Sequence, residues 1–232
     1  MHPPPKWKTP KGHDVTMRIR PDTIDWNICQ STIAEDEYHL GGLELSGLAL
    51  DIGGYAGSVA VMLLLDNPGL TVVTVEPVPE NVVLIRDNLA LNGVQDRCVV
   101  VEGAVGSETI YFDFDGDDGT VQDFADQHRW IGNAEGHALY SAGRAHRLVV
   151  VPAYTIDDLA PVDDIALVKL DCEGGEWNFL DDSHVGRIER IVGEWHPWPD
   201  DSKDATEALM RRLGDTHDIE MLEHETFRAV RR

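Results

Sequence analysis

Carboxylates and an imidazole follow two apolar segments in the C-terminal half of the chain. Asp171 ends the segment 165–170, and Glu194 and His196 lie at the end of the segment 188–195. Successive side chains of a strand point to opposite faces, so Glu194 and His196 share a face if the strand extends that far. Such a group can act as general base for a hydroxyl, or it can bind a divalent cation that acidifies the hydroxyl. We therefore predict Asp171, Glu194 and His196 as catalytic residues, and metal binding by the same three residues is left open.

His196 and two nearby carboxylates, Glu173 and Glu176, also have a purely structural explanation. His196 precedes Pro197 and can simply end its strand. Glu173 and Glu176 fall in the first turn of a predicted helix, where carboxylates stabilise the helix dipole. For Glu176 the structural explanation is the one we favour.

A glycine-rich segment in the N-terminal half has the composition of a ligand-binding turn. It follows a short apolar segment that ends at Ile52. Glycines allow a tight turn and a close approach of a ligand to the backbone, and the start of the following helix offers free amide groups. We predict that this turn binds a cofactor through Asp51, Gly53, Gly54, Tyr55, Gly57 and Ser58.

A second acidic residue, Glu76, ends the next β-branched segment and is followed by Pro77. A carboxylate at this place can accept hydrogen bonds from both hydroxyls of a ribose. Further along, Ala104 is small enough for an adenine ring to lie against the backbone, with Val105 as a side wall. Glu76, Pro77, Ala104 and Val105 therefore join the predicted cofactor site.

Two details favour a sulfonium-bearing amino acid over a dinucleotide. The glycines read Gly-Gly-x-x-Gly and not Gly-x-Gly-x-x-Gly, so the cradle for a pyrophosphate is incomplete. Asp51, directly before the turn, would repel pyrophosphate but can accept hydrogen bonds from an ammonium group. We therefore predict S-adenosylmethionine as the cofactor, and Asp171, near the transferred methyl, counts as a cofactor contact too. An NAD(P)-dependent oxidoreductase and a protein that kept the fold but lost its chemistry are the alternatives.

The candidate residues stand at the ends of strands in a regular alternation of strands and helices. Strands are predicted at 48–52, 70–75, 97–102, 109–114, 147–151, 165–170 and 188–195, helices at 56–66, 79–92, 121–130, 155–159, 173–180 and 203–213, and a hairpin at 219–222 and 227–230. This alternation predicts an α/β fold with a doubly wound, mostly parallel sheet, whose ligands bind beyond the carboxyl ends of the strands.

The chain is expected to form one domain with a loose start. Residues 1–22 lack apolar periodicity and are predicted to be a flexible N-terminal arm, and residues 23–232 a single Rossmann-like domain. Within it, residues 115–146 are rich in Gly, Asp, Asn and His. A long stretch of this kind inside a compact domain is usually functional, so we predict an insertion or lid that sets acceptor specificity.

Charge and hydropathy narrow the range of partners. The 42 acidic and 19 basic residues give a net charge of −23, which repels phosphate backbones and disfavours a nucleic acid substrate. The acidity also suits a salt-loaded cytoplasm, with an acidic protein of an ordinary cell as the alternative.

No apolar run approaches the roughly 18–20 residues that span a bilayer, and the start lacks the apolar region of a signal peptide. We expect a cytoplasmic protein with no membrane partner and with Cys29, Cys98 and Cys172 reduced.

Three motifs resemble, in order, those of the FkbM methyltransferase family. Asp51 to Gly57 resembles Asp-[Val/Ile]-Gly-Ala-Asn-x-Gly, Glu76 to Asn81 resembles Glu-Pro-x-Pro-Glu-Asn, and Lys169 to Glu176 resembles Lys-[Ile/Leu]-Asp-x-Glu-Gly-x-Glu. The chain departs from the first motif at Gly54-Tyr55, where the family has Ala-Asn.

The resemblance implies a seven-stranded sheet of the class I methyltransferase type with a C-terminal antiparallel hairpin. It also implies S-adenosylmethionine-dependent O-methylation of a hydroxyl on a sugar, polyketide or similar small metabolite, and it adds Asn81 to the cofactor site. A small-molecule hydroxyl acceptor is thus the expected partner. The sequence leaves the oligomeric state open, a dimer included.

Overall fold

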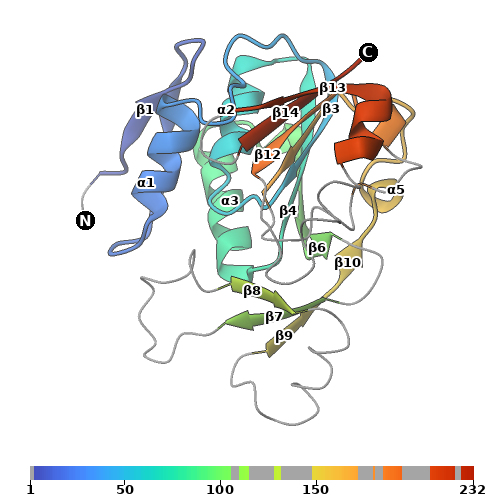
Figure 1. Cartoon of the computed structure of the whole chain (residues 1–232). Coiled ribbons are helices and arrows are strands. Elements are labelled where there is room, and N and C mark those ends of the chain that lie inside the picture. Colours follow the sequence, from blue (N-terminus) through green and yellow to red (C-terminus); the bar gives the residue numbers. More distant parts are fainter. Residues whose placement is uncertain are drawn as a thin grey trace.

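A seven-stranded sheet forms the centre of the protein (Figure 1). The computed structural model describes residues 3–105, 110–114, 128–131, 148–171, 180, 185–194, 210–222 and 226–232. The sheet has the order β13-β14-β12-β11-β3-β4-β5. Its strands are β3 (Gly47–Ile52), β4 (Leu70–Glu76), β5 (Cys98–Glu102), β11 (Leu167–Leu170), β12 (Arg190–Glu194), β13 (His217–Met221) and β14 (Thr226–Arg231).

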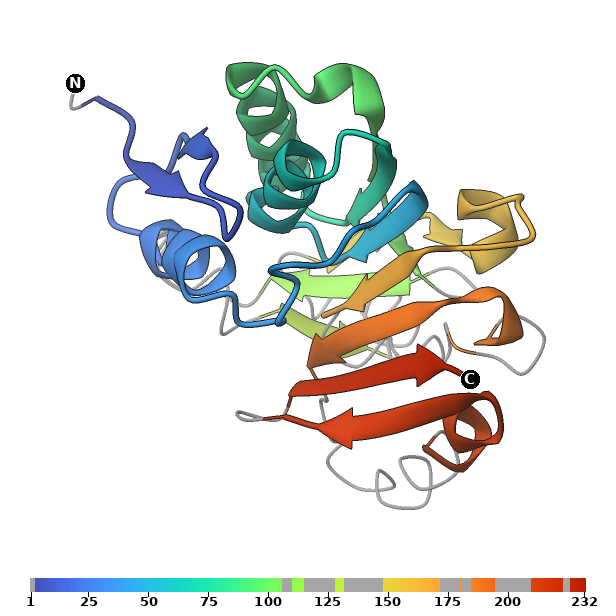
Figure 2. The ribbon, with the colours of Figure 1, turned by 90° about the horizontal axis from the view of Figure 1, so that it is seen from above.

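The sheet is parallel except at one end. Strands β12, β11, β3, β4 and β5 run parallel to one another, whereas β14 pairs antiparallel with β12 and β13 pairs antiparallel with β14. Figure 2 shows these two C-terminal strands, in red, at the end of the sheet away from the helices that follow β3 and β4. The predicted doubly wound, mostly parallel seven-stranded sheet with a C-terminal antiparallel hairpin is confirmed.

Alternate residues of the parallel strands enter two different cores, one on each face of the sheet. In β4, Leu70 and Val72 belong to one core and Val73 and Val75 to the other. Such double burial explains why the strand is a nearly continuous β-branched run. The first core also holds most of the helix at residues 58–66, whose side chains are buried almost all round.

The helices are α1 (Asp25–Cys29), which continues as a π-helix (Gln30–Ala34), then α2 (Ser58–Asp66), α3 (Pro79–Leu91) and α5 (Ile156–Leu159), with 3₁₀ turns at Gln95–Arg97 and Val185–Arg187. Pro79 begins α3, and Gly93, with φ +69°, follows its end, as the sequence predicts. Residues 210–216 are also helical, within and just beyond the predicted helix 203–213. The predicted helix 173–180 lies almost entirely outside the described residues.

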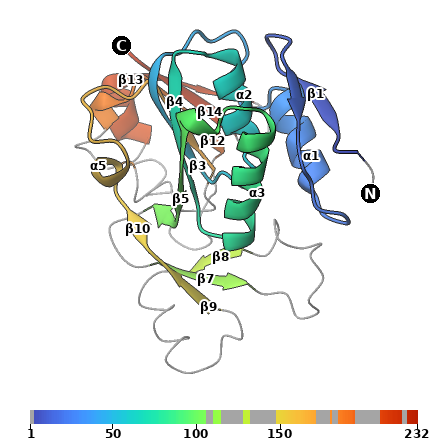
Figure 3. The same ribbon diagram turned by 180° about the vertical axis from the view of Figure 1, so that it is seen from behind.

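The N-terminal segment is not a loose arm. Strands β1 (Lys6–Lys8) and β2 (Asp14–Thr16) form an antiparallel hairpin, and Trp7, Val15 and Met17 are buried in the first core. The hairpin and α1 lie next to α2 and α3 (Figures 1 and 3). The prediction failed because the alternation Val15, Met17 and Ile19 is too short to stand out, and the burial of these residues depends on partners far along the chain.

Two small sheets extend the domain. Strands β6 (Ala104–Val105) and β10 (Ala153–Tyr154) pair in parallel, and β7 (Ile110–Phe114), β8 (His128–Ile131) and β9 (Leu148–Val151) form an antiparallel sheet in the order β8-β7-β9. The antiparallel sheet lies beyond the end of the central sheet at which β6 stands (Figures 1 and 3). The helix predicted over 121–130 is wrong at residues 128–130, which pair with β7, and the rest of the predicted lid lies outside the described residues.

Candidate active site

The predicted site lies where the order of strands reverses. After β3 the chain builds β4 and β5 on one side, and then returns to place β11 and β12 on the other side of β3. Loops at the carboxyl ends of β3 and β11 therefore part in opposite directions, and ligands of open parallel sheets bind in such crevices. In the pairing register Thr74, Asp51, Lys169 and Val192 are neighbours across four strands, so they share one face of the sheet.

The glycine-rich turn is held against the neighbouring strand β4. The amides of Gly53 and Gly54 both donate to the carbonyl oxygen of Val75, at 3.0 and 3.1 Å. A Cβ atom at Gly54 would lie 2.2 Å from Oγ1 of Thr74, so this position has no room for a side chain. Gly57, with φ +80°, then turns the chain into α2.

Tyr55 holds an unusual conformation at the top of this turn. Its φ of +47° lies in the left-handed region, which costs a residue with a large side chain about 1–2 kcal/mol. Its amide donates to Oε2 of Glu76 at 2.8 Å, and its hydroxyl donates to Oδ1 of Asp25 at 2.7 Å. These contacts hold a tyrosine where the family motif has asparagine, which adopts this conformation readily.

Glu76 is buried, and its carboxylate is bound mainly by the protein itself. Oε1 accepts hydrogen bonds from the amide of Val78 and from Nδ2 of Asn81, and Oε2 accepts one from the amide of Tyr55. Burial raises the pKa of Glu76, and these hydrogen bonds oppose the rise. Because a carboxylate has about four acceptor positions, one remains on Oε2 for a ligand hydroxyl. Oε1 is already used by two donors in this structure, and the bidentate contact of Glu76 with a ribose stays a prediction.

Asp51 is fully buried, and it contacts an ammonium group that belongs to the protein. Nζ of Lys169 lies 3.8 Å from Oδ1 of Asp51, and Thr74 donates to Oδ2 at 3.1 Å. Burial raises the pKa of Asp51, and the charge of Lys169 opposes the rise. The sequence predicts that Asp51 receives the ammonium of a ligand, whereas in the structure Lys169 takes this place.

Lys169 also connects the two sides of the crevice. Its ammonium donates to the carbonyl oxygen of Gly53 at 2.8 Å, in the cofactor turn, and to Oδ2 of Asp171 at 3.3 Å, beyond β11. The ring of Tyr38 covers the ammonium, with 5.2 Å between Nζ and the ring centroid. One buried cation thus fixes the cofactor turn and a predicted catalytic carboxylate relative to each other.

A segment that precedes β3 completes the crevice beside Asp171. The hydroxyl of Tyr38 donates to Oδ2 of Asp171 at 2.9 Å. Burial raises the pKa of Tyr38 well above its usual value, and the charges of Asp171, Glu194 and Glu37 add to the rise, so the hydroxyl remains a donor. Burial raises the pKa of Glu37 as well, against a hydrogen bond from Ser31 and together with the charges of Glu194 and Asp171.

Two of the three predicted catalytic residues therefore come together. Asp171 and Glu194 both act on Glu37 and Tyr38, and the side chain of Asp171 is 28% exposed, open to an acceptor. His196 lies outside the described residues. Among the residues that the structure describes, no three His, Cys, Asp or Glu side chains are grouped to hold a metal ion.

The remaining predicted cofactor residues lie at the same edge of the sheet. Ala104 and Val105 are buried in β6, and Val105 is the cross-strand neighbour of Tyr154 in β10. Pro77 is partly exposed directly after Glu76, and Ser58 begins α2, where its hydroxyl lies 2.8 Å from that of Thr32 in the π-helix.

Comparison with models of known protein families matches residues 51–228 to the family described as Methyltransferase FkbM domain. The match begins at Asp51, near the end of β3, and runs through the parallel strands into β14, so it includes the glycine turn, Glu76 and Asp171 but not Tyr38. The chain belongs to the FkbM methyltransferase family. A search among curated proteins gave no significant match.

Several solved structures that resemble this FkbM protein are methyltransferases. One is a precorrin-6Y C5,15-methyltransferase from Geobacter metallireducens, with 16% identity and a TM-score of 0.45, over 82% of this chain and 83% of the other. Another is an RNA methyltransferase from Salinibacter ruber in complex with S-adenosyl-L-homocysteine, with 13% identity and a TM-score of 0.43, over 85% and 89%. The helices of the described part of this FkbM protein are all too short or too polar to cross a bilayer.

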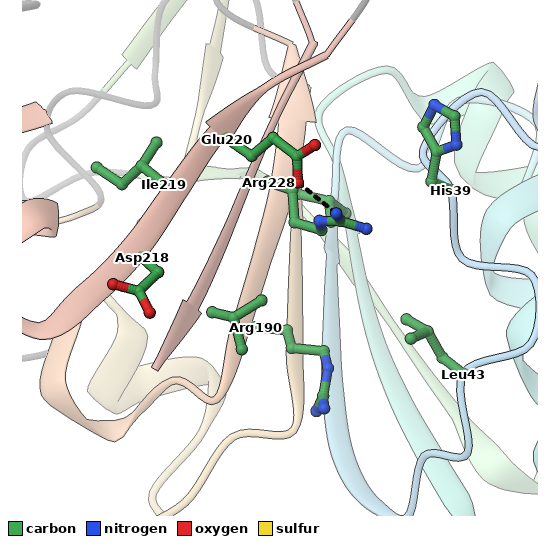
Figure 4. Close-up of a pocket in the computed structure, with 9 residues that line it drawn as sticks. His39, Leu43, Arg190, Asp218, Ile219, Glu220 and Arg228 are labelled. Atoms are coloured by element: carbon green, nitrogen blue, oxygen red, sulfur yellow. Dashed lines mark hydrogen bonds and ion pairs between the residues drawn. The ribbon is translucent and has the colours of Figure 1, made fainter. Parts of the chain in front are cut away.

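A cavity of about 400 Å³ lies on the same face of the FkbM sheet but closer to its C-terminal strands (Figure 4). Arg190, Asp218 and Glu220 lie on the sheet side, where Arg228 pairs with Glu220, and His39 lies across from them. Within the described part of the chain, none of the predicted cofactor or catalytic residues lines it. The cavity is therefore separate from the crevice between β3 and β11.

The structure adds four residues to the site of this FkbM domain that the sequence analysis did not identify: Arg20, Asp25, Tyr38 and Lys169. Lys169 had a detectable signal, because a lysine in an apolar strand is rare and the chain has only five lysines. The other three precede β3, outside the family motifs. Nothing in their spacing relates them to the crevice.

Proposed function

We propose that this FkbM protein is an S-adenosylmethionine-dependent O-methyltransferase that acts on a hydroxyl of a small metabolite. The observation that carries the proposal is the position of Lys169, whose ammonium binds both Gly53 in the cofactor turn and the Asp171 carboxylate. A hydroxyl that reaches Asp171 is therefore close to a ligand held by the turn.

The chemistry of the turn fits adenosylmethionine. Gly54 leaves the backbone bare, and Glu76 retains an acceptor position on Oε2 for one ribose hydroxyl. When bound, S-adenosylmethionine supplies an electrophilic methyl group on a sulfonium. A crevice rich in carboxylates suits this positive charge. Glu76 and the glycine turn would hold the nucleoside half, on the β4 side of the crevice.

Asp171 and its neighbours would prepare the acceptor. Tyr38 and Lys169 both donate to Oδ2 of Asp171, so the carboxylate has a fixed orientation. The bound cofactor would supply the methyl group, its sulfur leaving as a neutral thioether, and the carboxylate of Asp171 would accept the proton of the acceptor hydroxyl. Orientation in a site closed to water supplies most of the acceleration, up to about 7–11 kcal/mol in the best intramolecular cases.

Calorimetric titration of the protein with S-adenosylhomocysteine tests the cofactor. A Kd in the micromolar range supports the proposal, and it then justifies a screen of hydroxylated acceptors with labelled S-adenosylmethionine. Titrations in molar KCl with EDTA and with added magnesium show whether a divalent cation contributes. Binding of NADH without binding of S-adenosylhomocysteine would favour an oxidoreductase instead.

Turnover of His196→Ala tests the predicted third catalytic residue. We expect a loss of turnover with unchanged affinity for S-adenosylhomocysteine. Wild-type turnover would remove His196 from the mechanism and leave the proton with the carboxylates.

A further inference from the structure

A network of polar side chains joins the segment before β3 to the cofactor turn. The guanidinium of Arg20 donates to Oδ1 and Oδ2 of Asp25, at 2.8 and 3.0 Å, so the pair is bidentate. Asp25 in turn accepts a hydrogen bond from the hydroxyl of Tyr55, and Arg20 lies over the ring of Tyr55, 5.4 Å from its centroid. One side of the turn is thus fixed by a charged pair that no family motif contains.

The same guanidinium reaches the predicted ribose acid by a second route. Nη1 of Arg20 donates to Oδ1 of Asn81 at 2.8 Å, and Nδ2 of Asn81 donates to Oε1 of Glu76 at 3.1 Å. Glu76 then accepts the amide hydrogen of Tyr55 on its other oxygen, which closes the ring of contacts at Tyr55. Asp25, Asn81 and Glu76 are all almost completely buried, so the contacts are shielded from solvent.

We propose that Arg20 and Asp25 are positioning residues of the cofactor site. They act through Tyr55 and Asn81, and they fix the glycine turn and the Glu76 carboxylate in the geometry that binds the nucleoside half of the cofactor. This inference rests on the proposed function.

The charges of the network agree with this role. Burial would raise the pKa of Asp25, but the hydrogen bonds from Arg20 and Tyr55 outweigh it and hold the pKa below its usual value, so Asp25 is an anion. Burial raises the pKa of Tyr55, so its hydroxyl stays protonated and donates.

The left-handed conformation of Tyr55 explains why this chain needs the network. Asparagine, the residue of the family motif, occupies this region several times more readily than most residues, whereas a bulky side chain does so rarely. A tyrosine must therefore be held from outside, and Asp25 and Arg20 hold it at both its hydroxyl and its ring. The network would compensate for the departure from the motif at Tyr55.

Calorimetric titration of purified full-length variants with S-adenosylhomocysteine tests the inference. We expect Tyr55→Phe and Asp25→Asn each to weaken binding about tenfold, the effect of losing one hydrogen bond to a charged group. Adenosine, which contains the ribose but no amino acid, should lose affinity by the same factor. Equal affinity of both variants and the wild type would overturn the inference.

Two control variants separate positioning from a general loss of stability. Both variants change the N-terminal segment. Arg18→Gln removes an exposed ion pair with Asp87 of α3, and Thr9→Val removes a buried hydrogen bond to Asp66 at the end of α2. Thr9→Val should lower the Tm, and both should bind S-adenosylhomocysteine as the wild type does. A tenfold loss in Thr9→Val would show that any loosening of the N-terminal segment weakens binding, and it would overturn the positioning role.

A double-mutant cycle gives the sharpest test. In a Tyr55→Asn background the route from Asp25 to the turn is removed and only the route through Arg20 and Asn81 remains, so Asp25→Asn should weaken binding clearly less there than the tenfold expected in the wild type. The same tenfold loss in both backgrounds would overturn the inference. If the wild type itself fails to bind S-adenosylhomocysteine, the proposed function and this inference fail together, whereas wild-type binding with unaffected variants refutes the positioning role alone.

Discussion

Replacement of Lys169 by methionine tests the electrostatics at the centre of the crevice. The side chain of Lys169 is 3% exposed, and methionine keeps most of its length while removing the ammonium. The variant would leave the buried Asp51 without its countercharge and the carbonyl oxygen of Gly53 without a donor.

The distance between the charges sets the expected magnitude. At 3.8 Å between Nζ of Lys169 and Oδ1 of Asp51, an effective dielectric constant of about 20 gives an attraction of roughly 4 kcal/mol. Removing one partner of a buried ion pair typically costs about 3–5 kcal/mol. We therefore expect Lys169→Met to lower the free energy of unfolding by about 3–5 kcal/mol at pH 8, a large part of the roughly 5–15 kcal/mol of a typical domain.

The loss of stability in Lys169→Met should depend on pH, and the pKa of Asp51 sets the sign of this dependence. The folded-state pKa of Asp51 is already raised by burial, and it rises further when Lys169 is removed. A carboxyl group whose folded pKa exceeds its unfolded value, about 3.9, destabilises the protein increasingly as the pH rises from that value to the folded pKa. The difference between wild type and variant should thus be smaller at pH 5 than at pH 8.

Urea unfolding at both pH values, at one fixed salt concentration, measures the effect. Asp51→Asn combined with Lys169→Met removes both charges and should recover more than half of the lost stability. Lys8→Met, which breaks an exposed ion pair with Asp14, is the matched control and should cause no measurable change. An equal loss at the two pH values, or no recovery in the double variant, would refute the reasoning.

Three further predictions concern single side chains. Gly54→Ala places a Cβ 2.2 Å from Oγ1 of Thr74 and should cost about 1–3 kcal/mol in urea unfolding, whereas Gly186→Ala, with open space around it, should not. Tyr38→Phe loses the donor to Asp171 and should lower turnover about tenfold at unchanged affinity for S-adenosylhomocysteine; unchanged turnover would contradict its role. Burial lowers the folded-state pKa of His217, so stability should decrease as the pH falls below about 6.5, and His217→Gln should flatten this decrease in thermal unfolding.

The strands of the central sheet were predictable because their signals are local. The run Leu70 to Val75 is β-branched and apolar, and the motifs at Asp51, Glu76 and Asp171 mark the ends of strands in the structure. Knowing that the sheet is parallel was enough to bring these carboxylates to one edge. The position of the site at the switch point followed from the fold alone.

The contacts inside the site were not predictable in the same way. Lys169 reaches Asp51 only because β11 pairs with β3 in a register that sets these two residues opposite each other. Oε1 of Glu76 accepts hydrogen bonds from Asn81 and from the amide of Val78, which no composition rule reveals. The register of the strands and the direction of each side chain decide these contacts, and neither can be predicted from a single sequence.

The N-terminal hairpin shows the same limit at the level of the fold. The side chains of Asn88 and Asn92 in and after α3 bind the backbone of Arg18 and Thr16, about seventy residues earlier. Such asparagines look like ordinary helix-surface residues in the sequence. Their role is visible only once the two segments lie together.

The same hairpin has a consequence for the order in which the chain assembles. Nearly all residues of the first core come from positions 7 to 94, and the hairpin is tied to Asp66 and Asn92. During synthesis the hairpin leaves the ribosome before α3, so its apolar side chains are covered only after α3 has emerged. Once β5 has emerged, this half has three adjacent strands, the helices α1, α2 and α3 and the N-terminal hairpin, and it can collapse as one cooperative unit. The crevice forms later, when β11 adds to β3 and supplies Lys169.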